Sequence, residues 1–340
     1  MKRICFFSSD ARPLYKKDIF RVLALPSGYT IQFRYQIKYV DLDMDKLSSY
    51  KNQICIIFFT SGNTTQNPDK LTNTSIREGI IEDIVKDDDT GLVLFFLKLK
   101  SFKDFVLGSN LDSKLPPFKF AVELEGAEGK IKQWHEIISD IKGSFPHQLM
   151  YKFNFTKYNS KKEIEPKFNN TDFQSYYLFE DENSYTLHVA FYDTTSADEN
   201  IYQSIKFEQN GELLKINAPQ VIEIGAFKDN KSFNVFTNSL NSNNSFTYLN
   251  FNSNNNDSKS SKEEMYNVEI QIQINKNKKR SRDFAMYSIL AAISLGFGKV
   301  VTEKISIDGV FNLKLTIFII LTILLGAFSA YKLYKLFNKK

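Results

Sequence analysis

The chain has 340 residues, of which 42% are hydrophobic, and its formal net charge is +5 at pH 7. This hydrophobic content excludes global disorder, and the length suits two folded units plus a further segment better than one small core. Nine basic residues lie beside two apolar runs near the carboxyl end, so the rest of the chain is neutral or slightly acidic. We therefore do not expect nucleic acid as a partner.

Residues 1–115 are predicted to form a first β-rich domain. Phe, Tyr and Ile in short runs favour strands, and residues 31–40 alternate strictly between apolar and polar side chains, which predicts one buried and one solvated face. The expected strands are 2–7, 31–40, 53–60, 76–85 and 92–99, with a short helix over 12–25. The turn at 86–91 contains the Asp and Gly that a hairpin needs. Antiparallel hairpins with few helices indicate a small closed or half-closed barrel.

The two cysteines and the amino terminus point to the cytosol. Cys5 and Cys55 each lie inside an apolar run, so we expect two buried free thiols on neighbouring strands. The apolar run after Arg3 is too short for the hydrophobic region of a signal peptide. Without a secretory signal, a disulfide is not expected.

A second β-rich domain is predicted over residues 116–275, with Pro116 and Pro117 at its boundary. Residues 128–142 carry apolar side chains at helical spacing, including Ile131 and Trp134, and predict an amphipathic helix. The expected strands after residue 172 are 174–179, 185–192, 201–207, 213–216, 221–227, 232–237, 246–251 and 266–274. Strands at this spacing are typical of a sandwich or barrel. The Asn/Ser-rich tract 252–264 is predicted to be disordered.

No catalytic, cofactor-binding or metal-binding residue is predicted. The three histidines, His135, His147 and His188, have no Cys or His neighbour at the spacing of metal ligands. The Asp89-Thr90-Gly91 triplet resembles an aspartic-protease motif, but it follows charged residues and has no second copy, so a hairpin turn explains it better. The carboxylates of residues 41–45 lack the Gly and Glu of a calcium loop. No motif maps the chain onto a known family.

One weak binding signal lies in the first domain. Arg34, Lys38 and Arg77, with Lys51, are expected to form a basic patch beside aromatic side chains. Such a patch suits an anionic ligand or single-stranded nucleic acid, as in some small barrels. A solvated polar face with no ligand remains the alternative explanation.

Residues 276–340 are predicted to form a membrane anchor. Residues 315–333 carry no charge until Lys332 and are long enough to span a bilayer. Residues 284–301 form a weaker candidate span because Lys299 lies near their end. Basic residues flank the hairpin on both outer sides: Lys276, Lys278, Lys279, Arg280 and Arg282 before it, and Lys332, Lys335, Lys339 and Lys340 after it. The positive-inside rule then predicts a two-span integral membrane protein with both termini in the cytosol.

Each candidate span carries small residues at four-residue spacing. These are Ser288, Ala292 and Gly296 in the first span, and Thr322, Gly326 and Ala330 in the second. Stripes of this kind allow helices to approach closely in lipid. We expect the two helices to pack as an antiparallel pair, or the stripes to drive self-association into a homo-oligomer.

Three functions fit these features. The first is a non-enzymatic, membrane-anchored scaffold or binding protein, whose β domains face the cytosol and engage a cytosolic protein or a small anionic ligand. The second is a ligand-sensing effector of a defence type, whose hairpin oligomerises and perturbs the bilayer. The third is a membrane-tethered enzyme with a site built from residues scattered along the sequence. Leakage of vesicles on addition of ligand would separate the second function from the first.

Overall fold

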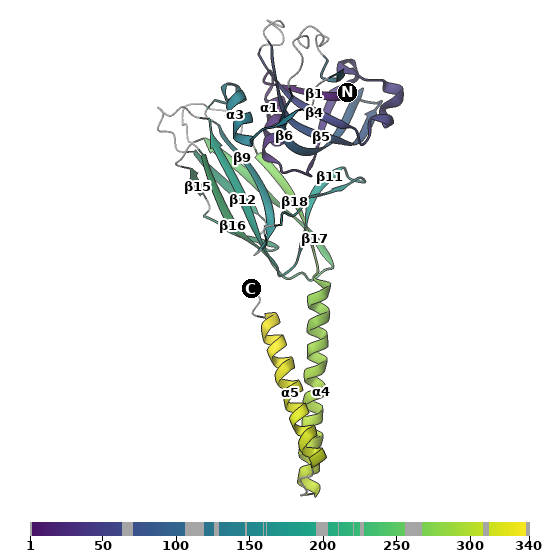
Figure 1. The fold of residues 1–340 in the computed structure, drawn as a ribbon, viewed down its shortest axis with the longest axis vertical. Helices are drawn as coiled ribbons and strands as arrows, with labels where there is room; N and C mark the ends of the chain where they lie inside the picture. Colours follow the sequence, from purple (N-terminus) through teal and green to yellow (C-terminus); the bar gives the residue numbers. More distant parts are fainter. Residues whose placement is uncertain are drawn as a thin grey trace.

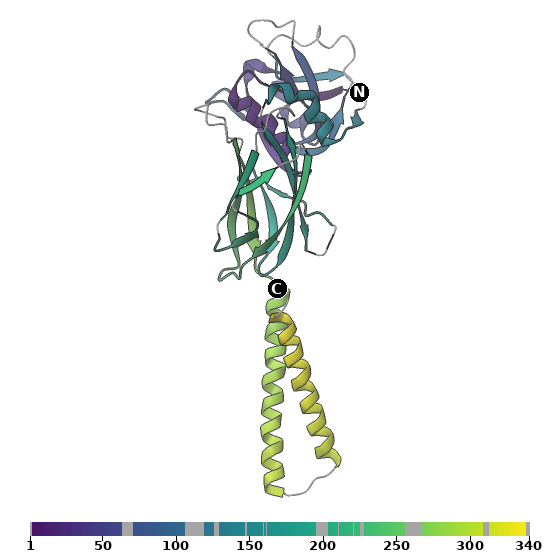
Figure 2. The same cartoon turned by 90° about the vertical axis from the view of Figure 1, so that its left-hand side faces the viewer.

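The computed structural model describes residues 2–337 except 63–70, 106–118, 126–128, 147, 159, 161, 195–202, 210, 220, 225–227, 256–266 and 309–312. The protein is mainly β, with three sheets and a C-terminal pair of long helices. Figure 1 shows the first β unit, a β-sandwich below it, and the helical hairpin at the opposite end. The turned view in Figure 2 shows the same three-part arrangement.

The first unit is built on one eight-stranded mixed sheet. Its strands are β1 (Lys2–Ser9), β2 (Thr30–Gln36), β3 (Val40–Asp41), β4 (Ile54–Ser61), β5 (Thr72–Asp87), β6 (Leu92–Asp104), β7 (Ala121–Glu125) and β8 (Lys130–Ile131). The strand order is β2-β6-β5-β4-β1-β7-β3, and β8 pairs with β6. The neighbouring strands β1 and β4 run parallel and hold Cys5 and Cys55, which are both buried and free as expected.

The sheet curls into a half-closed barrel because the chain turns a corner after β2. A single strand was expected over 31–40, but β2 ends at Gln36, the short 3-10 helix η1 (Ile37–Tyr39) follows, and β3 pairs with β7. The backbone N–H of Phe120 donates to the carbonyl of Tyr39 at 2.8 Å. Strands β2 and β3 lie at opposite ends of the strand order, but only the three residues of η1 separate them in the sequence. This short connection brings the two edges of the sheet towards each other.

The second unit is a β-sandwich, which is one of the two predicted alternatives, a sandwich or a barrel. Its strands are β9 (Leu149–Lys157), β10 (Lys167–Asn169), β11 (Gln174–Glu180), β12 (Ser184–Asp193), β13 (Gln203–Gln209), β14 (Leu214–Asn217), β15 (Val221–Ile224), β16 (Lys228–Thr237), β17 (Asn244–Asn255) and β18 (Asn267–Asn275). A six-stranded sheet, β10-β11-β18-β17-β13-β15, and a four-stranded sheet, β14-β16-β12-β9, enclose the core. Its aromatic packing includes Phe153 stacked on Phe251, with ring centroids 4.8 Å apart.

Helix α1 (Pro13–Ala24) lies where the two units meet. Its buried face is apolar, and the ring of Phe20 meets that of Tyr151 edge-on at 5.0 Å between centroids. Ser175 of β11 accepts a hydrogen bond at its Oγ from the backbone N–H of Thr30, at 2.8 Å. One continuous hydrophobic core therefore extends through both units.

The boundary between the units lies later than residue 115. Strands β7 and β8 belong to the first sheet, and the indole Nε1 of Trp134 in α3 (Trp134–Ile141) donates to the carbonyl of Leu23 in α1. The helix predicted over 128–142 is shorter, because the side chains of Gln133 and Glu136 form a capping box that begins it at Trp134. Ile131 instead lies exposed in β8. Pro116 and Pro117 lie outside the described residues.

The tract predicted to be disordered, 252–264, begins inside a strand. Residues 252–255 complete β17 and pair with β13, with Asn252 opposite Lys206. Pairing with β13 gives these residues the backbone hydrogen bonds of a strand, which the Asn/Ser-rich composition did not predict. Residues 256–264 lie outside the described part of the chain.

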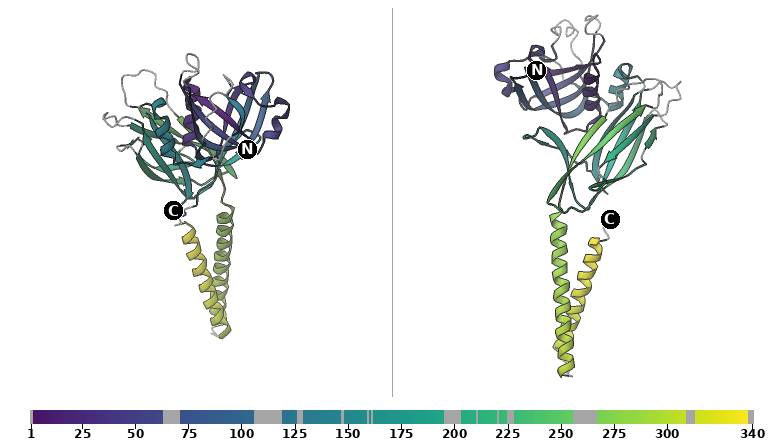
Figure 3. Two further views of the ribbon diagram at one scale, coloured as in Figure 1. Left: turned by 45° about the horizontal axis from the view of Figure 1, so that its top comes forward. Right: turned by 180° about the vertical axis from the view of Figure 1, so that it is seen from behind.

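Two long helices follow β18. They are α4 (Lys278–Asp308) and α5 (Leu313–Phe337), and the segments Arg282–Val300 and Ile317–Lys335 are long and apolar enough to cross a membrane. The ring of Tyr287 contacts that of Phe328, and the ring of Phe297 contacts that of Phe318, so the helices run antiparallel. Seen from behind in Figure 3, the hairpin leaves the sandwich at the end away from the first unit.

Candidate functional site

A cavity of about 730 Å³ lies in the first unit, where β1 ends and α1 begins. We call it the β1–α1 pocket and define it by Ser8, Ser9, Arg12, Tyr15, Asp18, Phe33, Arg34, Tyr35, Lys38, Tyr39 and Phe120. Strand β2 and the corner after it form the opposite wall. The pocket therefore lies between α1 and the β2 edge of the half-closed barrel.

Local hydrogen bonds set the turn from β1 into α1. The hydroxyl of Ser8 donates to the carbonyl of Tyr15 at 3.0 Å, and Ser9 Oγ accepts from the backbone N–H of Ala11 at 3.4 Å. Pro13 is the first residue of α1, where the missing N–H of proline costs nothing. Asp10 accepts from the hydroxyl of Ser144 at 3.2 Å. These side chains hold the rim of the pocket through bonds within the protein.

Aromatic side chains line the pocket wall. The hydroxyl of Tyr35 donates to the carbonyl of Phe7 at 3.1 Å, and burial raises the pKa of this phenol well above its usual value. The ring of Tyr35 stacks on Phe120 with centroids 6.3 Å apart, and Tyr39 meets Phe120 edge-on at 5.3 Å. The wall therefore offers ring faces and edges to an occupant.

Three exposed cations, Arg12, Arg34 and Lys38, surround these rings. The guanidinium of Arg12 lies 5.8 Å from the ring centroid of Tyr15, and the ammonium of Lys38 lies 5.0 Å from that of Tyr39. None of the three forms a side-chain hydrogen bond or an ion pair within the described part of the chain. Their donors are therefore directed to solvent or to a ligand.

Among the described residues that line the β1–α1 pocket, Asp18 is the one with an acidic side chain. Burial raises the pKa of this carboxyl to about 6, and the positive charges of Arg21, Arg34 and Lys17 oppose the shift. The pocket therefore combines three cations with one carboxyl that is only partly ionised near pH 6. Its charge is positive throughout the neutral pH range.

Two of the three predicted patch residues meet in this pocket, and the third does not. Arg77 is 1% exposed, and its guanidinium donates to the carbonyls of Val22 and Leu25 at 2.6 Å each. It therefore binds the C-terminal carbonyls of α1 instead of facing solvent with Arg34 and Lys38. Lys51 pairs with Asp83 on β5. Sequence reasoning missed Arg12, whose signal is its position immediately before the helix-starting Pro13.

Some of the other polar residues considered as sites have structural partners. Asp87 accepts from the backbone N–H groups of Asp89 and Thr90, which forms the predicted hairpin turn. Asp43 pairs with Lys46 at 2.9 Å. His188 lies between two hydroxyl groups, and His147 lies outside the described residues. No cluster of three or more His, Cys, Asp or Glu side chains is placed to hold a metal ion in the region that the structure describes.

The two basic flanks of the hairpin lie at the same end of it. Figures 1 and 2 show the start of α4 and the end of α5 close to the sandwich. Lys276, Lys278 and Arg282 are exposed at the start, and Lys332 and Lys335 lie in the last turns of α5. Lys279 and Arg280 lie in α4, with side chains that are not described, and Lys339 and Lys340 lie beyond the described residues.

The small residues of the hairpin have different surroundings. A Cβ added at Gly326 would lie 2.7 Å from Ser294 Oγ, and this hydroxyl donates to the carbonyl of Thr322 at 2.9 Å. Thr322 and Gly326 therefore lie at the contact between α4 and α5, opposite Ser294. A Cβ added at Gly296 would meet nothing within 4 Å, and Ala292 and Ala330 are exposed. Ser288 is half-buried.

The comparisons with known proteins assign the chain to no family. No protein-family model matches it, and no curated protein matches its sequence. Its function therefore has to be inferred from the β1–α1 pocket and the hairpin themselves.

Proposed function

We propose that the protein is a membrane-anchored binding protein, and that the β1–α1 pocket takes a small anionic ligand. The observation that carries this proposal is the meeting of Arg12, Arg34 and Lys38 around an aromatic wall. Cations that are not paired within a protein bind carboxylate and phosphate groups through charge-assisted hydrogen bonds. No covalent chemistry is assigned to the pocket, and the proposed activity is binding.

The pocket favours an anion that carries a planar ring. Its volume of about 730 Å³ falls in the range of small-molecule sites. The rings of Tyr39 and Phe120 offer contacts to a planar group, while the guanidinium of Arg34 matches the geometry of an oxyanion. A nucleotide or a similar aromatic phosphate satisfies both requirements, whereas a simple inorganic ion fills little of the space.

The position of the pocket favours a water-soluble ligand. The two apolar helices and their basic flanks support a bilayer anchor with both termini in the cytosol. Figure 1 places the first unit at the end of the molecule away from the hairpin. A pocket in that unit would stand off the membrane surface, where a soluble anion reaches it more readily than a lipid headgroup does.

A binding assay on the full chain in detergent tests the proposal. Nucleoside mono-, di- and triphosphates would be titrated by calorimetry against the wild type and the Arg34→Ala/Lys38→Ala variant. We expect the wild type to bind at least one of them, and the variant to bind it at least about tenfold more weakly, because two charge-assisted contacts are lost. Lys215→Ala, which removes an exposed cation from β14, is the matched control. Equal affinity of all three proteins, or no binding by any, would contradict the proposal.

The exposed hairpin supports a second candidate function, a ligand-triggered membrane effector. Apolar side chains of α4 and α5 are exposed, with Leu295 at 77% and Ile323 at 63%, and the face around Gly296 is open. A second copy of the hairpin has room to pack there. Reconstituted protein would release a dye from vesicles on addition of the bound nucleotide if this function holds. A binding protein with a passive anchor would release none.

A further inference from the structure

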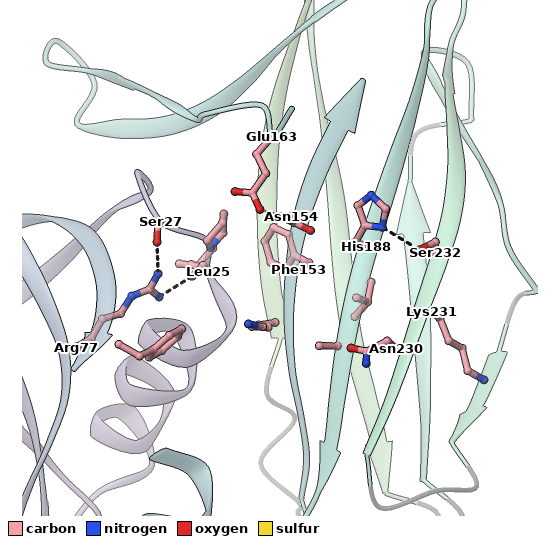
Figure 4. A pocket seen from close by; sticks show the side chains of 15 residues that line it. Leu25, Ser27, Arg77, Phe153, Asn154, Glu163, His188, Asn230, Lys231 and Ser232 are labelled. Carbon is pink, nitrogen blue, oxygen red and sulfur yellow. Dashed lines mark hydrogen bonds between the residues drawn. The ribbon is translucent and has the colours of Figure 1, made fainter. Parts of the chain in front are cut away.

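A second cavity, of about 370 Å³, lies between the two β units. Figure 4 shows its lining: Ser27, Leu25 and Arg77 come from the first unit, while Asn154, His188 and Ser232 come from the four-stranded sheet of the sandwich. We call it the inter-unit pocket. An occupant would contact both units at once, unlike a ligand in the β1–α1 pocket.

Lys152 of β9 is half-buried and lines the inter-unit pocket. Its ammonium group lies 6.0 Å from the ring centroid of Phe102 and 5.5 Å from that of Trp134. It forms no hydrogen bond or ion pair with a side chain that the structure describes. Burial and the nearby positive charge of Arg77 lower the pKa of Lys152, while Glu163 opposes this shift. The ammonium group of a half-buried lysine is costly without an acceptor, so an anion in the pocket would stabilise it.

Arg77 adds a second positive charge to the same wall. Its donors are used by neutral acceptors, namely the carbonyls of Val22 and Leu25 at 2.6 Å and that of Lys100 at 2.7 Å. These bonds satisfy its geometry but leave its charge without a carboxylate. Together, Arg77 and Lys152 therefore give the wall an excess of positive charge.

The remaining polar groups are arranged around these two cations. The one carboxylate of the lining, Glu163, accepts a hydrogen bond from Asn154 Nδ2 at 2.6 Å. His188 has its Nδ1 2.8 Å from the hydroxyl oxygen of Ser232 and its Nε2 3.0 Å from that of Thr156. When the imidazole donates to Ser232, the hydroxyl proton of Ser232 is available to a ligand. The pocket is therefore lined by a cation, Lys152, and by the hydroxyl group of Ser232.

We propose that the inter-unit pocket is a second anion site, and that it takes a phosphate-like oxyanion on Lys152 and Ser232. The oxyanion is either free inorganic phosphate or the phosphoryl group of a small metabolite, since the volume leaves space beyond one phosphate. Bound there, it offsets the positive charges of Lys152, from the sandwich, and of Arg77, from the first unit. This site is separate from the β1–α1 pocket and does not depend on the function proposed for it.

Calorimetric titration of the full chain in detergent tests this site, with inorganic phosphate and ribose 5-phosphate as probes at constant ionic strength. We expect Lys152→Met to weaken binding of the probe at least about tenfold, and Lys152→Arg, which keeps the charge, to weaken it much less. The Lys215→Ala control and the Arg34→Ala/Lys38→Ala variant should bind as the wild type does. Tighter binding of ribose 5-phosphate than of phosphate would identify a metabolite as the source, and the reverse order would identify free phosphate.

Two results would overturn the proposal. The first is equal affinity of Lys152→Met and the wild type, or no binding of either probe to the wild type. The second is loss of binding in Arg34→Ala/Lys38→Ala, which would move the anion to the β1–α1 pocket. Ser232→Ala, expected to weaken binding several-fold, repeats the test if Lys152→Met does not fold, and equal affinity of that variant would count against the site in the same way. The thermal unfolding midpoint of each variant checks its folding.

Discussion

The guanidinium of Arg77 donates from its Nη1 to the carbonyl oxygen of Leu25, the residue that ends helix α1, at 2.6 Å. A cation at the C-terminus of a helix satisfies carbonyls that have no partner in the helix and opposes the negative end of its dipole. This contact joins strand β5 to helix α1 through two residues that lie 52 positions apart in the sequence. The contact also holds α1, which forms one wall of the β1–α1 pocket.

Replacing Arg77 should destabilise the first unit. Arg77→Met leaves the buried carbonyls of Val22 and Leu25 without charged donors, which costs about 3 kcal/mol of unfolding free energy. Chemical denaturation of the full chain in detergent, followed by circular dichroism, measures this loss. Arg77→Lys keeps the charge but not the planar fork of donors, so its loss should be smaller. An unchanged midpoint for Arg77→Met would contradict the helix-capping role.

Asp18 should make stability depend on pH. Its pKa is raised from 3.8 to about 6 in the folded protein, so the folded state holds its proton over a range where the unfolded state has lost it. The stabilisation of the folded state by this retained proton is fully present below about pH 4 and is lost as the pH rises through 6. Asp18→Asn should therefore be more stable than the wild type at pH 7.5 by about 1–3 kcal/mol, with no such difference at pH 4. Unfolding midpoints at several pH values test this, and a constant difference would refute it.

Ser175 should hold the edge of β2 against the sandwich. Its Oγ accepts from the N–H of Thr30 at 2.8 Å and donates to the carbonyl of Thr30 at 3.2 Å, and the site is buried. Ser175→Ala leaves both backbone groups unsatisfied and should cost about 1–3 kcal/mol. Amide hydrogen exchange should accelerate at Thr30 in this variant. Exchange as slow as in the wild type would show that this bond does not protect the inter-unit contact.

The two hairpin glycines should respond differently to the same substitution. Gly326→Leu places side-chain atoms where Ser294 Oγ lies and should separate α4 from α5, whereas Gly296→Leu meets open space and should leave the pair intact. Disulfide cross-linking between Tyr287→Cys and Phe328→Cys, whose rings are in contact, reports the pairing. The cross-link should be lost only with Gly326→Leu. If Gly296→Leu changes oligomerisation but leaves the cross-link intact, this would support association between chains through the exposed face around Gly296.

Cysteine labelling tests the proposed insertion of the hairpin in a membrane and the orientation predicted for it. The native thiols of Cys5 and Cys55 are buried, and burial raises the pKa of Cys5 to about 12, so neither should react with a maleimide in the folded protein. Lys335→Cys should be labelled from the cytosolic side of sealed vesicles, and Asp308→Cys from the opposite side. Labelling of both positions from one side would rule out two spans with cytosolic ends.

Much of the secondary structure follows from local sequence patterns. The alternation in residues 185–192 and 268–274 predicts strands that the structure contains as β12 and β18, because a period of two buries one face of a strand whichever strand lies beside it. The same holds for the hairpin turn at Asp87. Local patterns misplaced the ends of elements where a partner decides them, as at Gln36, where the chain leaves β6 and turns to pair with β7.

The sequence by itself determined the strand content, the turn residues and the apolar helices with their basic flanks, since each depends on residues close together in the chain. Only the tertiary structure decided which cations share a pocket. Arg34 and Arg77 both occupy strands of one sheet, but α1 covers Arg77 and leaves Arg34 exposed beside Arg12. Which face of a strand a helix covers depends on packing between distant segments, and the pattern along one strand carries no record of it.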